Sequence, residues 1–116
     1  MLALKFRSRV ALAAIALALL SQPAVAAGDA ARGQGLYAVC STCHGPNAEG
    51  MHEMNAPALA GREAWYLIRQ LENFKAGIRG THPDDVYGQQ MAPMAQLLAD
   101  TQAIQDVAAY LSSLGH

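Results

Sequence analysis

The stretch "AVCSTCHGPN", residues 38–47, contains both cysteines of the 116-residue chain, Cys40 and Cys43, and His44 directly follows the second cysteine. Residues three apart project from the same side of a helical turn, so the two thiols face one direction. A disulfide between them would close a very small loop and would constrain the unfolded chain little. The cluster therefore points to chemistry rather than to a structural cross-link.

Three kinds of site use two thiols at this spacing. A thioredoxin-like redox pair requires strands around it, and the chain lacks alternating strand patterns. A structural zinc site requires a second ligand pair, and none of the other three histidines belongs to a spaced pair. In covalent haem attachment each thiol adds to one vinyl group, and the adjacent histidine binds the iron. The pattern favours one haem c, held by thioethers from Cys40 and Cys43, with His44 as an iron ligand.

The first 26 residues predict a secretory signal peptide. Three basic residues precede an apolar run over residues 10–20, and small residues at 24–26 form a cleavage site. This run of 11 apolar residues is shorter than the roughly 20 that span a bilayer, although a retained anchor stays open as the alternative. Cleavage after Ala26 predicts a domain over residues 27–116, exported to the periplasm and not stably inserted in the membrane.

The predicted exported domain is small and acidic. Its 90 residues contain five Lys and Arg against nine Asp and Glu, a formal net charge of −4. No basic patch remains to neutralise phosphates, so the composition argues against nucleic acid and favours a partner with a basic docking surface. A domain of this size buries a modest core and usually needs disulfides, a metal or a large ligand, which agrees with haem.

Apolar residues recur at helical spacing in three segments, residues 30–39, 62–76 and 101–114. Asp29 and Asp100 are the expected N-caps of the first and last helices. The stretch "THPDDVYG", residues 81–88, is turn-rich and has no assigned role. The predicted fold class is all-α, a small domain of three main helices with long loops wrapped around one covalently bound haem.

The chain from residue 28 to residue 114 resembles the class I c-type cytochromes, particularly the single-domain cytochromes c553 and the half-domains of cytochrome c4. The similarity covers "GDAARGQGLYAVCSTCHG", "NAPALAG", "WYLIRQLENFKAGIRG", "QQMAPMAQLLAD" and "IQDVAAYLSSL". The resemblance implies that the first and last helices cross at Gly33, where the absence of a side chain permits close approach. It also implies that Tyr37 and Tyr110 lie at this crossing.

The resemblance implies two further residues of the haem site. In the family, the second iron ligand is a methionine seven residues before the leucine that precedes the last helix, and this count from Leu98 reaches Met91. Met94, a histidine or an open position remain alternatives. The proline of the family's Pro-X-Leu is Pro57 here, and its carbonyl is expected to accept a hydrogen bond from the outer nitrogen of the ligand imidazole. A plain turn proline is the alternative.

A methionine at the sixth position closes the iron and suits electron transfer, whereas an open position lets small molecules bind. The sequence offers no nucleophile and base pair, phosphate-binding loop or paired carboxylates. It predicts a periplasmic monohaem c-type cytochrome, not an enzyme, that carries single electrons between respiratory redox proteins, a terminal oxidase among the candidate acceptors. An electron-entry subunit of an oxidase or dehydrogenase complex, and a haem enzyme or gas-binding protein with an open sixth site, remain alternatives.

Overall fold

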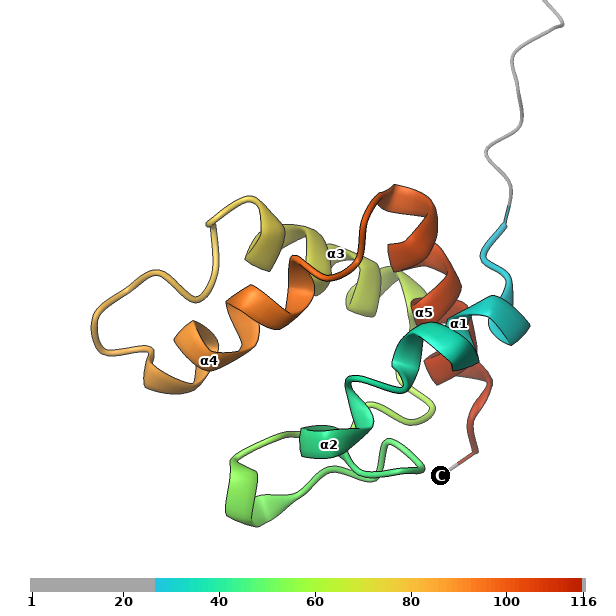
Figure 1. Ribbon diagram of the computed structural model, residues 1–116, viewed down its shortest axis with the longest axis horizontal. Helices are drawn as coiled ribbons and strands as arrows, with labels where there is room; N and C mark the ends of the chain where they lie inside the picture. The colour runs from blue at the N-terminus through green and yellow to red at the C-terminus, as the bar shows by residue number, and fades with distance from the viewer. Residues whose placement is uncertain (1–26, 116) are drawn as a thin grey trace, which may run out of the picture.

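The computed structural model describes residues 27–115, so the predicted signal peptide, residues 1–26, lies outside the described residues together with His116. The elements are α1 (Ala30–Tyr37), α2 (Ser41–His44), the short 3-10 helix η1 (His52–Met54), α3 (Ala64–Lys75), α4 (Val86–Ala95) and α5 (Thr101–Ser113) (Figure 1). Within residues 27–115 the only pairing of the β type is an isolated bridge between Met51 and Ala56. None of the helices in this range is long and apolar enough to cross a bilayer. The all-α prediction is confirmed.

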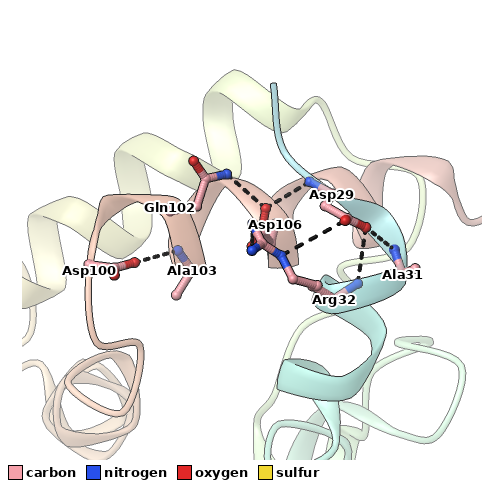
Figure 2. A network of polar contacts seen from close by, with 7 residues as sticks. All are labelled: Asp29, Ala31, Arg32, Asp100, Gln102, Ala103 and Asp106. Carbon is pink, nitrogen blue, oxygen red and sulfur yellow. Dashed lines mark hydrogen bonds and ion pairs between the residues drawn. The ribbon is translucent and has the colours of Figure 1, made fainter. Parts of the chain in front are cut away.

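Both predicted N-caps are present, and they start the two helices that cross. The Asp29 carboxylate accepts from the backbone N–H groups of Ala31 and Arg32 at the start of α1. The Asp100 carboxylate accepts from the Ala103 N–H at 2.8 Å at the start of α5. Figure 2 shows both caps on the two neighbouring helices. Each cap satisfies backbone donors that have no partner inside the helix.

The α1 and α5 helices pack directly against each other at Gly33, as the resemblance implied. A Cβ atom added to Gly33 would lie 1.9 Å from the Asp106 carbonyl oxygen, so any residue other than glycine would clash here. The rings of Tyr37 and Tyr110 lie at this crossing with centroids 5.6 Å apart and planes tilted by 49°. The expected contact between these tyrosines is therefore confirmed, and its geometry suits paired aromatic rings.

A buried carboxylate joins the start of α1 to the middle of α5. Asp106 is 3% exposed and accepts from the Asp29 N–H at 2.7 Å and from Gln102 Nε2 at 2.9 Å. Its other oxygen lies 2.9 Å from the Arg32 guanidinium (Figure 2). The Asp29 N–H bond is the largest of the causes that hold the pKa of Asp106 below its ordinary value. This network fixes where α1 begins relative to α5.

The core lies where α3 packs against α5, and a further helix extends from it. Buried residues of the core include Tyr37, Leu67, Leu98, Ile104, Val107 and Leu111. In Figure 1, α4 lies beside α3 and away from the α1–α5 crossing, and the α2 and η1 segments extend in another direction. The cysteine motif and the methionine segment thus lie on two separate arms of the domain.

The sequence does not predict α4, the ten-residue helix that carries both candidate methionine ligands. The turn-rich stretch of residues 81–88 leads into it, because the Asp85 carboxylate caps the helix by accepting from the Gly88 N–H at 2.9 Å. Gln89 Nε2 also donates to the His82 carbonyl at 2.6 Å, which ties the preceding turn to the first turn of α4. Gly88 and Pro93 lie inside the helix and are poor helix formers, so the helix propensity of this segment does not predict α4.

Candidate haem-binding site

The two cysteines and His44 lie on one helical turn that follows α1. Cys40 N–H donates to the Tyr37 carbonyl at 2.8 Å, and His44 N–H donates to the Cys40 carbonyl at 3.0 Å, so the chain winds continuously from α1 through α2. Both thiols are free and partly exposed. Burial is the main cause that raises the pKa of the Cys40 thiol, with a smaller contribution from Cys43. The neutral form of the Cys40 thiol is therefore favoured.

The His44 imidazole is buried and held in a defined orientation. The residue is 7% exposed, and its Nδ1 lies 2.8 Å from the Pro57 carbonyl oxygen. A carbonyl oxygen only accepts, so Nδ1 carries the proton and donates to Pro57. In this tautomer the unprotonated nitrogen is Nε2, the atom that binds a metal. The hydrogen bond thus prepares His44 as a ligand through Nε2.

The loop between His44 and Pro57 is fixed to the motif by hydrogen bonds. The buried Tyr37 hydroxyl donates to the Gly45 carbonyl at 2.6 Å. Gly50 N–H donates to the His44 carbonyl at 2.7 Å, and Leu59 N–H donates to the Ala48 carbonyl at 2.9 Å. Burial raises the pKa of Tyr37 to about 12, so its hydroxyl stays protonated and remains a donor at neutral pH. The Pro57 carbonyl is therefore held where His44 meets it.

The methionines predicted as alternatives for the second ligand lie one turn apart on α4. Met91 is partly buried, whereas Met94 is 37% exposed. The histidines at positions 52 and 82 are exposed, and His116 lies outside the described residues. Met91 is thus more enclosed than Met94, which suits a thioether that is held in place.

The residues present fit a haem c in their chemistry. Two free thiols three residues apart match the two vinyl groups, and a buried imidazole with a free Nε2 matches the iron. Large apolar side chains are exposed on both arms, and such side chains could pack against an apolar haem ring. They are Val39, Met54, Ile78, Val86, Tyr87, Met94 and Leu97. Within residues 27–115 no three His, Cys, Asp or Glu side chains gather as ligands for a metal ion without a cofactor.

The sequence did not reveal two hydrogen-bonding roles that shape this site. Tyr37 was expected only as an aromatic contact, and its hydroxyl bond to Gly45 depends on where the loop folds back. Asp106 appears in the sequence as one polar position of an amphipathic helix. Its burial follows from a backbone partner, Asp29, that is 77 residues away. Helical periodicity gives no signal for this role, because Asp106 does not share the face of Ile104, Val107 and Leu111.

Comparisons with known proteins agree with this site. The cytochrome c family model matches residues 30–115. Cytochrome c4 of Azotobacter vinelandii is 41% identical over 90 residues, which cover 76% of this chain and 42% of that protein. Cytochrome c-554(548) of Halomonas halodenitrificans is 38% identical over 87 residues, which cover 75% of this chain and 98% of that protein.

A solved structure gives the same result for the fold. The crystal structure of reduced recombinant cytochrome c4 from Pseudomonas stutzeri matches with a TM-score of 0.62 and 40% identity, over 77% of this chain and 47% of that chain. The chain therefore spans less than half the length of the cytochrome c4 proteins that it matches. It belongs to the cytochrome c family, as a class I c-type cytochrome that resembles a half-domain of cytochrome c4 and binds one haem c through Cys40 and Cys43.

Proposed function

We propose that this chain is a monohaem single-electron carrier whose iron is held by His44 and Met91. The observation that supports this most strongly is the buried imidazole of His44, whose Nδ1 is bound to the Pro57 carbonyl at 2.8 Å beside two free thiols. In this proposal Pro57 orients the ring and raises the basicity of Nε2. The domain that acts is residues 27–116, and residues 1–26 are a signal peptide that directs it to the periplasm.

Bound haem supplies one-electron chemistry between ferrous and ferric iron. Cys40 and Cys43 would anchor the haem covalently, which prevents its loss between electron-transfer events. Met91 contributes a neutral, soft sulfur that stabilises reduced iron more than a second imidazole would. A closed sixth position also excludes oxygen and other small ligands, so the domain passes electrons without transforming a substrate.

The proposed partners are an electron donor and an electron acceptor, both redox proteins, and a terminal oxidase is a candidate acceptor. Residues 27–116 carry a formal charge of −4, so a partner with a basic docking surface would be attracted over a distance. This attraction weakens as salt screens the charges. The electron-transfer rate to a cationic oxidant should therefore fall as ionic strength rises, and the rate to an anionic oxidant should rise.

Carbon monoxide separates this proposal from a haem enzyme or gas-binding protein. The purified haem protein is reduced, its absorption spectrum is recorded, and carbon monoxide is added. A carrier with both axial positions closed should show no spectral change on the timescale of mixing and should titrate as a one-electron centre. Rapid formation of a carbon monoxide complex by the wild-type protein would favour the open-site alternative instead.

A further inference from the structure

The last residue of α3 holds the turn that follows α4 through its side chain and its backbone. Lys75 is partly buried, and its Nζ donates to the Leu98 carbonyl oxygen. In return, Gln96 Nε2 donates to the Lys75 carbonyl at 3.2 Å. Residues 96–98 are therefore bound to α3 by two hydrogen bonds that run in opposite directions.

The positive charge of Lys75 is favourable beside the C-terminal end of α4. The last turn of α4 contains no basic residue of its own, and the end of a helix leaves carbonyl groups without partners. A cation near such carbonyls is favoured by their partial negative charge. Leu98 is 5% exposed and Ala95 is fully buried, so the bond to Leu98 also joins a turn that is anchored in the core.

The other end of α4 is held by the loop that precedes it. A Cβ atom added to Gly80 would lie 2.4 Å from the Gly88 carbonyl oxygen, so the backbone at residue 80 lies against the first turn of α4. Gly80 also has a positive φ of 79°, a conformation that favours glycine. Met91 lies between these two attachments, three residues after Gly88 and five before Gln96.

We propose that Lys75 is a positioning residue for Met91, acting through its bond to Leu98 to hold the α4 segment in place. This inference rests on the proposed ligation of the iron by Met91. A thioether is a weak, neutral ligand, so the iron–sulfur bond alone does not fix the segment against movement. The bond from Lys75 lowers the fraction of molecules in which α4 has moved and Met91 has left the iron.

Binding of imidazole to the ferric haem protein measures that fraction. Imidazole reaches the iron only after Met91 has moved away, so its apparent Kd falls in proportion as the open fraction rises. Lys75→Met keeps the length of the stem and removes the donor. We expect it to bind imidazole roughly tenfold more tightly than the wild type, which corresponds to about 1.4 kcal/mol. The wild type should show the near-infrared charge-transfer band of thioether-bound ferric iron in the absence of imidazole.

Three further variants make the test specific. Arg69→Met removes an exposed cation from the same helix, where it lies 5.4 Å from the Trp65 ring, and should leave the imidazole affinity unchanged. Lys75→Arg retains a long cationic donor and should recover most of the wild-type affinity. Gln96→Ala removes only the reciprocal bond from an exposed side chain, and we expect a roughly threefold gain, in line with the loss of one modest hydrogen bond.

The outcomes separate this inference from the proposed function. If Lys75→Met binds imidazole as the wild type does, or if Lys75→Arg gains as much affinity as Lys75→Met, Lys75 does not position Met91 through its donor. Should Lys75→Met fail to fold, Lys75→Gln decides the question, because its shorter, uncharged side chain also removes the ammonium donor to Leu98: tighter imidazole binding supports the inference and an unchanged affinity overturns it. A wild-type protein without the near-infrared band would refute the ligation by Met91 itself, whatever the variants do.

Discussion

The hydroxyl of Tyr37 donates a buried hydrogen bond of 2.6 Å to the carbonyl of Gly45, the residue directly after His44. The same ring packs on Tyr110 of α5 at a centroid distance of 5.6 Å. One side chain thus joins the helix crossing to the turn that carries the haem-binding residues. Its two contacts can be separated, because the hydroxyl serves the loop and the ring serves the crossing.

Tyr37→Phe removes the hydroxyl and keeps the ring. We expect it to lower the free energy of unfolding by about 0.5–1.5 kcal/mol, because the buried Gly45 carbonyl loses one of its two donors and keeps only the Ala48 N–H at 3.1 Å. Chemical denaturation of the haem protein measures this change. Tyr87→Phe is the matched control, since Tyr87 is 55% exposed, and it should leave the stability unchanged. Equal stability of all three proteins would show that the hydroxyl bond contributes nothing.

Gly33→Ala tests the close crossing of α1 and α5. A methyl group there would lie 1.9 Å from the Asp106 carbonyl oxygen and 2.8 Å from the Tyr110 Cβ, so the helices must move apart. We expect a loss of about 1–3 kcal/mol in the free energy of unfolding. On the same helix, Gly35 has nothing within 4 Å of an added Cβ, and Gly35→Ala should stabilise the domain by about 0.5–1 kcal/mol. Similar effects of both substitutions would contradict the crossing.

The network around Asp106 predicts a stability that depends on acid pH. The pKa of Asp106 is held below its ordinary value, first by the Asp29 N–H bond and then by Gln102 and Arg32. Because the folded pKa is lower than the unfolded value of 3.8, the carboxylate stabilises the fold above that pH, and this stability is lost as pH falls through the folded pKa.

Asp106→Asn isolates this contribution. The variant should be less stable than the wild type near neutral pH, and the gap between their unfolding midpoints should narrow as pH falls below 3.8, where the unfolded carboxyl is already protonated. Thermal unfolding of both proteins across this range gives the comparison. Asp84→Asn is the control, since the Asp84 side chain is 93% exposed. If the difference between the two unfolding midpoints stays constant with pH, the ionised carboxylate of Asp106 does not stabilise the fold.

Much of the fold and of the haem-binding site could be predicted, because the residues that indicate these features lie close together in the sequence. Cys40, Cys43 and His44 lie within five residues, and each helix cap lies beside the helix that it starts. Gly33 stood out through the resemblance, and the structure gives the physical reason in the Asp106 carbonyl. These features depend on spacing or on a single backbone position, which a sequence records directly.

The features that were missed depend on partners that are distant in the sequence. The α4 helix begins at an Asp85 cap within a stretch of turn residues, and Pro93 lies inside it, so local propensity argues against it. The Lys75 side chain acts on a carbonyl 23 residues away. Backbone acceptors such as Gly45 and Leu98 have no signature in a sequence, because every residue carries a carbonyl group.

The proposed electron-carrier function depends on Met91 closing the sixth position of the iron. The most direct measurement is the near-infrared spectrum of the oxidised wild type, Met91→Ala and Met94→Ala, because sulfur bound to ferric iron gives a weak charge-transfer band there. We expect the band in the wild type and in Met94→Ala, and its loss in Met91→Ala together with carbon monoxide binding by the reduced Met91→Ala protein. A band that persists in Met91→Ala and disappears in Met94→Ala would move the ligand by one helical turn. Absence of the band from the wild type would show that no methionine binds the ferric iron.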